Sequence, residues 1–511
     1  MPNTRLLASH VPSYMVDWVS SFLWERTCTL LFQVSPNLSS LVLVGTPQGS
    51  PISPLLFLLY VSPLHMSIPR GLIVSYVDQV SITVASPSHR GNIRKLQRLF
   101  NTVAARGRDI DVSFLVPKTE LIHWRSPSQR SPPSLAPIEL EGHLFQPSRV
   151  VRWLGDWFTP ALNTTHHFRH RLSLAQAIFS FVKRLSSPGA GLKPLLCYRI
   201  ANSLLLPILT YGADLLTPNS SALRSMDSFW HRVQRWTTNN FFSTPTSILS
   251  RKACLPPVIS YCRYRRRLAA LRVACAPPYA NPASARLPQS FPSLSSFRAQ
   301  DSSRHLTVGL SSVYLPLSWK TKTPSPPIRK HLPVDALVHL TLPLQEGLTR
   351  LPLVLHAPPP PGANIPPSEL IKRAYQPLRA RAREMLLQDW VTDAPTPPYY
   401  DFPPLLTQHP FMGLGKFVAG RIHQMRAAKS YLAAHTSWFN ANPDPTCPRC
   451  EEESETFTQA ILTCPARTKV RDLLQKDVSS LGPDADLWTE PLLVRALGEY
   501  ITDTKTGFPR T

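Results

Sequence analysis

The decisive stretch reads Gly45-Thr-Pro-Gln-Gly-Ser-Pro-Ile-Ser-Pro-Leu-Leu-Phe57, and it joins a loop with two glycines to an apolar segment. Glycines adopt backbone dihedrals that other residues avoid and let a ligand approach the backbone closely. We expect Ser53 to cap a helix with Pro54 at its first position. The N–H groups of that helix start, together with the Gln48 amide, could then meet a ligand. The alternative is an ordinary turn followed by a capped helix.

A second short stretch, Tyr76-Val77-Asp78-Gln79, lies in a segment that predicts a hairpin. Leu72–Val84 alternates apolar and polar residues on both sides of Asp78-Gln79, as in two strands joined by a tight turn. Asn92–Arg106 has apolar residues on one helical face. Other expected elements are a helix within residues 11–33 that leads into a strand at Thr29–Val34, and short strands around Leu121–Trp124, Ile138–Leu140 and Arg152–Leu154.

Composition limits the class of protein. The chain has 511 residues, 43% of them hydrophobic, which indicates a folded protein of two or three domains. Its 55 prolines require long non-helical connections. The net charge of +24 favours a polyanionic partner such as nucleic acid, and the alternative is a basic protein whose charge serves only solubility. The first residues lack the apolar core of a signal peptide, and no apolar run is long enough to cross a bilayer. We therefore expect an intracellular protein that is not secreted, with the nucleus as a plausible location and no membrane partner.

From Asn163 onward the pattern changes to long helices. They are expected at about 163–186, 192–216 and 220–241, and a further helix carries the cluster Arg263–Arg267. Residues 277–366 are rich in Pro and Ser and predict a linker. Helices return at Ser368–Trp390 and at about 413–439.

These motifs together resemble the reverse transcriptases of non-LTR (LINE-like) retrotransposons, a class of transposable element. Residues from Val11 to Cys275 look like the second half of that enzyme. The resemblance implies an RNA template and a DNA primer as partners, and Lys118 as the residue that assists the departure of pyrophosphate. It implies that template, primer or substrate is contacted by Gly45, Pro47, Gln48, Gly49, Ser50, Tyr76, Gln79, Trp153 and Gly155. The helices after Asn163 look like the family's thumb.

The family carries two adjacent aspartates where this chain has Asp78 and Gln79. Nucleotidyl transfer uses two Mg²⁺ ions, and Mg²⁺ prefers carboxylate and phosphate oxygens. By resemblance Asp78 is both the catalytic residue and the magnesium ligand, whereas Gln79 has no charge. The strand that supplies another aspartate in the family is missing before Gly45. We therefore expect a truncated RNA-directed DNA polymerase with little or no activity; the alternative is a non-catalytic RNA- or DNA-binding protein derived from a retroelement.

A second constellation consists of Cys447, Cys450, Gln459 and Cys464. It resembles the Cys-Cys-His-Cys zinc knuckle that follows the polymerase in these elements, with Gln459 in the position of the histidine. Thiolates two residues apart can chelate zinc, and a fourth ligand closes the tetrahedron. Either three thiolates bind zinc with His435 or a water, or the knuckle has lost its metal.

Two further basic clusters have alternative interpretations. His166, His167 and His170, with Arg169 and Arg171, look like metal ligands at first sight. The alternative, which we favour, is a basic face of a thumb helix, because no carboxylate or cysteine is expected nearby. The late helices could bind single-stranded RNA or present a solvated face; their candidate residues are Lys416, Arg421, Arg426, Lys429, Tyr431 and Trp438.

The sequence thus predicts an α+β protein. Its parts are a partial palm with an antiparallel hairpin (1–160), a helical thumb (161–276), a Pro-rich linker (277–366), a basic helical region (367–441), a degenerate knuckle (442–475) and a tail (476–511).

Overall fold

A computed structural model describes residues 11–30, 38–42, 45–69, 72–86, 88–124, 137–140, 142–184, 191–275, 367–395, 413–438, 444–468 and 491–507. These residues form two compact units, one that ends at Val151 and one that begins at Arg152. The predicted linker over 277–366 lies outside the described residues. Helices and small antiparallel hairpins make up the fold, which is a mixed α and β architecture.

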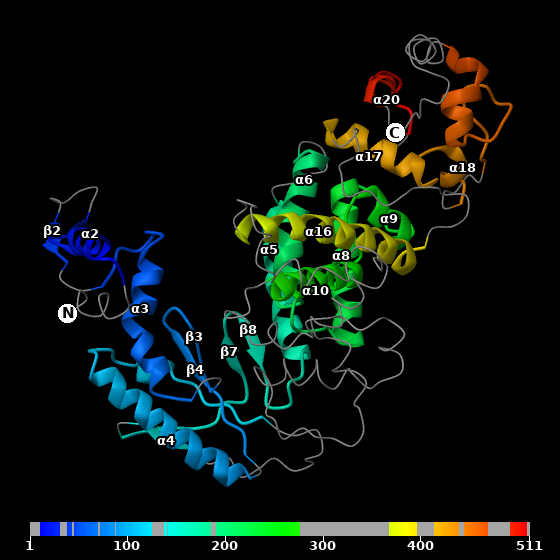
Figure 1. Cartoon of the computed structure of the whole chain (residues 1–511). Coiled ribbons are helices and arrows are strands. Elements are labelled where there is room, and N and C mark those ends of the chain that lie inside the picture. The colour runs from blue at the N-terminus through cyan, green and yellow to red at the C-terminus, as the bar shows by residue number, and fades with distance from the viewer. Residues whose placement is uncertain are drawn as a thin grey trace. The chain divides into compact units, whose positions relative to one another are not determined.

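The first unit contains the predicted hairpin (Figure 1). Strands β3 (Ile73–Tyr76) and β4 (Gln79–Ile82) pair antiparallel, and Val77-Asp78 forms the two-residue turn between them. Val77 has a φ of 53°, which is unusual for a β-branched residue. Strain of this kind persists only where the surrounding structure holds it, and it is common at functional turns.

Two helices pack against this hairpin. They are α3 (Ser53–Met66) and α4 (His89–Arg108), as the sequence predicts. Their shared core is apolar and consists of Val61, Leu64, Ile68, Ile73, Val103 and Ile110. The expectation that Ser53 caps α3 is wrong: Ile52 holds the cap position without a side-chain bond, and Ser53 is already helical. The Ser53 hydroxyl instead donates to the carbonyl of Pro47 at 2.6 Å.

The remaining elements of this unit are short. They are α2 (Ser13–Leu23), β1 (Thr27–Leu30), β2 (Leu38–Leu41), η1 (Val116–Lys118), β5 (Ile138–Leu140) and β6 (His143–Phe145). The strand expected at Thr29–Val34 begins earlier, at Thr27, and pairs with the unpredicted β2. No strand forms at Leu121–Trp124, where Leu121 makes only a single bridge to Pro147. That segment has β-like residues, but among the residues that the structure describes no strand pairs with it to form a ladder.

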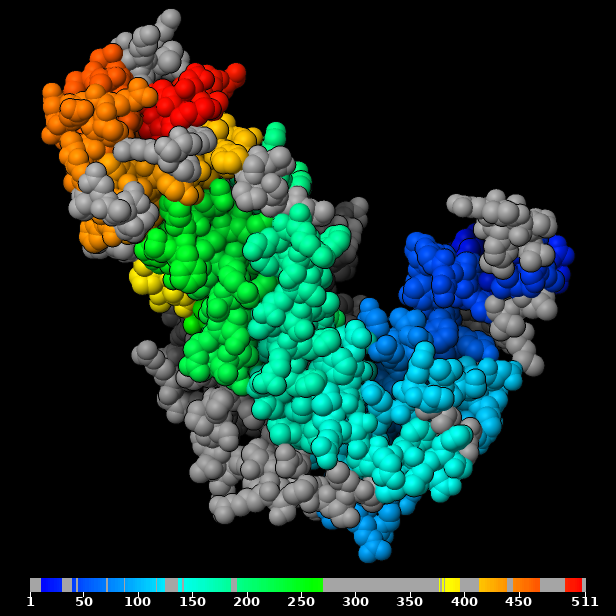
Figure 2. Space-filling view, turned by 180° about the vertical axis from the view of Figure 1, so that it is seen from behind, coloured from blue at the N-terminus to red at the C-terminus, as the bar shows by residue number. Residues whose placement is uncertain are grey.

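The second unit begins with a hairpin and continues as a helical bundle. Strands β7 (Val151–Trp153) and β8 (Asp156–Phe158) are paired. The helices are α5 (Thr165–Arg184), α6 (Pro194–Ile200), a π-helical turn η2 (Ala201–Leu205), α7 (Leu206–Leu209), α8 (Ser220–Thr238), α9 (Thr246–Lys252) and α10 (Val258–Cys275). Their common core includes Phe168, Leu205, Leu206, Leu209, Met226, Phe229, Trp230 and Val258. In Figure 2 the cyan and green atoms of this bundle form a continuous surface.

The helix expected over 192–216 is interrupted in the structure. It divides into α6, the π-helical turn and α7, and it ends at Leu209. Pro207 explains the break, because proline removes one helical N–H and its ring crowds the preceding turn. A π-helical turn is a common way for a helix to absorb such a defect.

Helix α16 (Pro367–Asp393) runs beside α10 (Figure 1), although about 90 residues separate the two in sequence. Trp390 is fully buried, and its indole N–H donates to the hydroxyl of Ser250 at 2.9 Å. The arginine cluster predicted on α10 is paired internally. Its salt bridges join Arg263 to Asp393, Arg265 to Asp214 and Arg267 to Asp389.

The C-terminal elements of the second unit share a separate core. They are α17 (Lys416–Arg426), α18 (Ala433–Thr436), a π-helical turn η5 (Gln459–Thr463), the short η6 (Pro465–Arg467) and α20 (Pro491–Thr504). The core residues are Ile422, Met425, Leu432, Ala460, Ile461, Leu493, Val494, Leu497, Tyr500 and Ile501. The helix expected over 413–439 breaks after Arg426, where Ala428 takes a φ of 50°. No helix in the described part of the chain is long and apolar enough to span a membrane.

For the three cations of α17, both interpretations given above for the late helices are wrong. Lys416, Arg421 and Arg426 are 9%, 6% and 6% exposed, so they form neither a solvated face nor an open RNA-binding face. Arg421 lies over the ring of Tyr431 at 4.6 Å. In contrast, Trp438 is 87% exposed.

Candidate functional site

The loop that precedes α3 is braced from two sides. The Arg26 guanidinium donates to the carbonyl of Gly45 at 2.8 Å, and Ser53 donates to Pro47. Gly45 and Gly49 have φ values of 82° and 92°, in the left-handed region that favours glycine. A Cβ at either position would meet no atom within 4 Å, so the backbone here is open to a ligand. Gln48 is exposed on the same loop.

The turn of the β3–β4 hairpin presents Asp78 and Gln79 to solvent. Asp78 belongs to no group of three or more His, Cys, Asp or Glu side chains that could share one metal ion, among the residues that the structure describes. Gln79 contributes a neutral amide. This set does not fit a pair of Mg²⁺ ions, which require several hard anionic oxygens. Lys118 ends the short η1 turn in the same unit and is also exposed.

In the second unit, the turn of the β7–β8 hairpin is fastened to the helical bundle. The Tyr211 hydroxyl donates to the carbonyl of Leu154 at 2.7 Å, and the Arg171 guanidinium donates to the carbonyl of Gly155. Arg171 also lies over the Tyr211 ring, 4.0 Å from its centroid. These contacts fix the orientation of the hairpin that carries Trp153 relative to α5.

A buried histidine, His167, also links the β7–β8 hairpin to the helical bundle. His167 accepts a hydrogen bond from the backbone N–H of Trp157 through Nδ1, and its Nε2 therefore carries the proton and donates to the carbonyl of Tyr211 at 2.8 Å. Burial lowers the pKa of His167 to about 4, although the Tyr211 carbonyl opposes that shift. His167 is thus a neutral structural residue at pH 7.

Asp156 contradicts the expectation that no carboxylate lies near the histidines of α5. Its Oδ1 is 3.8 Å from Nε2 of His167. Burial raises the pKa of Asp156 to about 6, while the Arg171 charge opposes the shift and Asp214 adds to it. The sequence offered no local pattern for this pair, because strand β8 and helix α5 meet only in the folded chain.

Two glycines allow this close packing. Gly155 and Gly212 have φ values of 86° and 77°. A Cβ at Gly155 would lie 2.9 Å from the Tyr211 hydroxyl oxygen, and one at Gly212 would lie 2.8 Å from His167 Nε2 and closer still to Asp156. Both positions therefore require glycine for conformation and for space. These glycines are the sequence signal that could have revealed the network.

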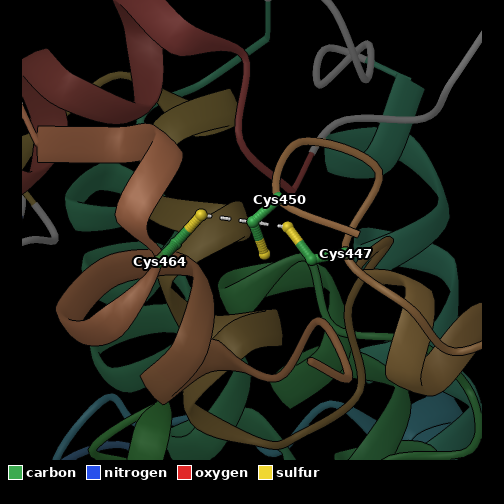
Figure 3. A group of neighbouring side chains, drawn as sticks. All are labelled: Cys447, Cys450 and Cys464. Carbon is green, nitrogen blue, oxygen red and sulfur yellow. Dashed lines mark hydrogen bonds between the residues drawn. The ribbon is translucent and has the colours of Figure 1, made fainter. Parts of the chain in front are cut away.

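The predicted knuckle brings its three cysteines together (Figure 3). The Sγ atoms of Cys447, Cys450 and Cys464 all lie within 4.8 Å of one another, and those of Cys447 and Cys464 are 4.0 Å apart. Gln459 occupies the fourth side of the cluster: its Nε2 donates to Sγ of Cys450 at 3.1 Å, and its Oε1 is buried without a hydrogen bond to the described residues. His435 is not part of the cluster. Its Nδ1 lies 2.8 Å from the carbonyl oxygen of Ser430.

The thiols of the knuckle are electrostatically unequal. Burial raises the pKa of Cys447, but hydrogen bonds from the backbone N–H groups of Arg449 and Cys450 outweigh burial, and the net shift is downward. Burial and the neighbouring Cys447 raise the pKa of Cys464. Three clustered thiols, one of them acidified, form a donor set that suits a soft divalent metal.

The knuckle is anchored within the C-terminal core. Glu455 is buried; its carboxylate accepts from the Arg467 guanidinium at 2.7 Å and from the backbone N–H of Ala433 at 2.8 Å. Arg467 also donates to the carbonyl of Ala460 at 3.1 Å. The exposed side of the knuckle carries Glu451, Glu452 and Glu453, which would repel phosphate groups.

Comparison with known proteins identifies the N-terminal part. Residues 4–158 match the family described as reverse transcriptase (RNA-dependent DNA polymerase). Residues 4–158 are a reverse transcriptase domain. The chain is also similar to a probable RNA-directed DNA polymerase from transposon BS of Drosophila melanogaster, with 28% identity over 144 residues. That match covers 27% of this chain and 16% of the relative.

The reverse transcriptase domain thus contains the loop at Gly45, the hairpin at Asp78 and Lys118, and it ends at β8. The predicted resemblance to a reverse transcriptase is confirmed for residues 4–158. The individual roles assigned to these residues stay predictions. The helical bundle and the knuckle lie beyond the matched residues.

Proposed function

We propose that this chain is a nucleic-acid-binding protein of a non-LTR retrotransposon, with an RNA template and a DNA primer as its partners, whose reverse transcriptase domain supports little or no DNA synthesis. The observation that carries the proposal is the two-residue turn of the β3–β4 hairpin. The turn keeps the strand pairing and the strained backbone of a functional hairpin, but it presents Asp78 beside a neutral Gln79.

The expected loss of rate follows from electrostatics. Two metal ions stabilise the attacking and leaving oxygens in this chemistry, and each ion must be held by negative charge. Removal of one such stabilising interaction costs about 3 kcal/mol or more, which is a factor of a hundred to a thousand in rate. A lone carboxylate beside an amide lacks the charge for two dications. Nucleic-acid binding needs no such carboxylates, and it is supported by the net charge of +24.

Primer extension tests the catalytic half of the proposal. The purified chain is given an RNA template, an annealed DNA primer, deoxynucleotides and Mg²⁺ or Mn²⁺. We expect extension at the level of the Asp78→Ala variant, and Gln79→Asp is the matched variant that restores the charge. Extension by the wild type that Asp78→Ala abolishes would show that the domain is active and the proposal wrong.

RNA binding tests the other half. The wild type and Asp78→Ala should bind RNA equally, with affinity that falls steeply as salt is raised. Absence of binding at low salt would overturn the binding role, whatever the extension assay shows.

We also propose that the knuckle holds one zinc ion through Cys447, Cys450 and Cys464, with Gln459 as the fourth ligand. The buried Oε1 of Gln459 supports this, because rotation of the amide by half a turn exchanges its oxygen with the nitrogen that now faces Cys450. Zinc bound there would stabilise the fold of the C-terminal core. Glutamine is a weaker ligand than histidine, so we expect an affinity below that of a Cys-Cys-His-Cys site.

Zinc content per chain, measured by elemental analysis after dialysis, tests this assignment. We expect one zinc per wild-type chain, loss of zinc in Cys447→Ser and tighter binding in Gln459→His. If the wild type carries no zinc and Gln459→His carries one, the natural knuckle has lost its metal and the proposal fails.

A further inference from the structure

Helix α4 of the reverse transcriptase domain is cationic along its whole length. Over His89–Arg108 it contains no Asp or Glu. Its basic residues are Arg90, Arg94, Lys95, Arg98, Arg106 and Arg108. Ser88 caps the helix by accepting from the N–H of Gly91 at 3.1 Å, so the helix start is well defined.

The two faces of α4 differ sharply. One face is buried in the core of the first unit through Val103, Ala104 and Gly107. The opposite face exposes Arg90, Arg94, Lys95 and Arg98. Arg90, Arg94 and Arg98 follow at intervals of four residues, so they lie on one side of the helix, about 6 Å apart along its axis. Below, the name "basic row" means these three arginines together with Lys95.

The basic row is electrostatically unfavourable for the isolated domain. Like charges four residues apart repel each other on a helix surface. Cations in the first turns are also repelled by the positive end of the helix dipole, which lies at the N-terminus of the helix. In the part of the chain that the structure describes, none of the four side chains has an ion pair with a carboxylate; near the other end of α4, Arg106 pairs with Asp109.

Other basic clusters of the chain are neutralised differently. Three of the four arginines of the α10 cluster pair with Asp214, Asp389 and Asp393, and Arg495 of α20 pairs with Glu499. The cations of α17 are buried. The basic row therefore stands out as a set of exposed cations that no carboxylate of the described residues neutralises, and a polyanion would relieve its repulsion.

We propose that the basic row binds the phosphate backbone of nucleic acid without reading its sequence. The inference rests on the proposed nucleic-acid-binding function and adds a contact surface distinct from the Gly45 loop and the β3–β4 hairpin. Regularly spaced cations match the repeated charge of a polynucleotide. The aromatic residue of α4, Phe100, packs edge-on against Phe145, so this helix does not use it to stack on bases. Backbone contact with little base preference follows.

The test removes charge and keeps the helix. In the triple variant Arg90→Gln, Arg94→Gln, Arg98→Gln, glutamine preserves the helix propensity. Binding of the full-length chain to a labelled RNA of mixed sequence is measured from low to moderate salt. Three lost contacts should lower the slope of log affinity against log salt by about 2 for a single strand. Affinity at about 0.1 M salt should fall by on the order of tenfold to a hundredfold.

Two control variants show whether a change in RNA binding comes from the charge of the basic row or from other effects of the substitutions. Replacement of the three arginines with lysine should leave the salt slope unchanged, since point charges suffice for phosphate. Lys183→Gln, Arg184→Gln, Arg495→Gln removes three exposed cations outside α4 and should change the slope by much less. Circular dichroism confirms that every variant is folded. An RNA–DNA hybrid run in parallel shows whether a duplex uses the same surface.

Each result has a defined meaning. If the wild type does not bind RNA at all, the proposed function and this inference both fail. If the wild type binds but the glutamine variant keeps the same slope and affinity, the inference alone fails. If polyglutamate competes as well as RNA and is equally weakened by the glutamine variant, the surface is a general polyanion site and the assignment to nucleic acid is wrong.

Discussion

Substitution of Gly212 by alanine offers the sharpest test of the network that fastens the β7–β8 hairpin. The residue has a φ of 77°, which costs an alanine about 1 to 2 kcal/mol. The added Cβ would also lie 2.8 Å from His167 Nε2 and nearer to Asp156 Oδ1. Overpacking of a rigid site typically adds about 1 to 3 kcal/mol. We therefore expect a total destabilisation of about 3 kcal/mol.

Gly507→Ala is the matched control in the same unit. Its φ is 73°, but its Cβ would meet first the flexible Met425 side chain, at 3.3 Å from Sδ. We expect that variant to lose only the conformational part, about 1 kcal/mol. A second variant, Asp156→Ala combined with Gly212→Ala, removes the closest obstacle and should recover about 1 kcal/mol or more through positive coupling.

Hydrogen exchange of the full-length chain, read by mass spectrometry, provides the assay. Peptides that cover 152–158 and 205–215 should lose protection in Gly212→Ala, while peptides of the first unit should not change. The steric argument is refuted if Gly212→Ala and Gly507→Ala are equally destabilised, or if the double variant shows no coupling.

Four further predictions concern buried titratable groups. Asp156 has a pKa raised from 3.8 to about 6, so in His167→Gln the unfolding free energy should rise as pH falls from 6 toward 4, because the folded carboxyl holds the proton more tightly. His167 has a pKa lowered from 6.5 to about 4, so in Asp156→Asn the unfolding free energy should fall as pH falls from 6 toward 4. In each variant the unfolding free energy should change by at most about 1.4 kcal/mol per pH unit. Urea titrations in which the unfolding free energies of both variants change in the same direction with pH would contradict the assignment. Burial holds the pKa of Lys252 well below its usual value, so Lys252→Met should stabilise the chain at pH 7, with a gain in unfolding free energy that shrinks toward pH 10; a loss at pH 7 would mean that the ammonium is stabilised in the fold. Glu455→Ala leaves the guanidinium of Arg467 buried without its carboxylate and should cost about 3 kcal/mol or more, seen as lost exchange protection over 444–468, whereas intact protection would show that the pair is dispensable.

Secondary structure built from consecutive residues could be predicted from the sequence, whereas contacts between residues far apart in the sequence could not. The hairpin at Asp78 and the helix over Asn92–Arg106 follow from periodicity, because each is built from consecutive residues. The cap at Ser53 was wrong since a loop carbonyl competes for its hydroxyl. Nothing local shows that a serine will turn back toward Pro47 rather than forward to the helix.

The salt bridges could be predicted even less well, because their partners lie far apart in the sequence. Arg265 and Asp214 are separated by 51 positions, and Arg263 and Asp393 by 130, so their pairing depends on the tertiary fold. Of the candidate site, the cysteine cluster was predictable because metal-ligand spacing is a local code. The position of Gln459 beside Cys450 could be predicted, because Gln459 occupies the histidine position of the cysteine spacing. That His435 lies outside the cysteine cluster could be seen only in the structure.

The pairing of α10 with α16 has a consequence for synthesis of the chain. Ribosomes add about 5 to 20 residues each second, so the roughly 90 residues between the two helices take on the order of ten seconds to make. Throughout that interval Ser250, Arg263 and Arg267 lack their partners Trp390, Asp393 and Asp389. The α10 surface that α16 later covers is therefore exposed on the nascent chain during this interval. Chaperones or proteases that recognise such exposed surfaces would act on the chain mainly at that stage.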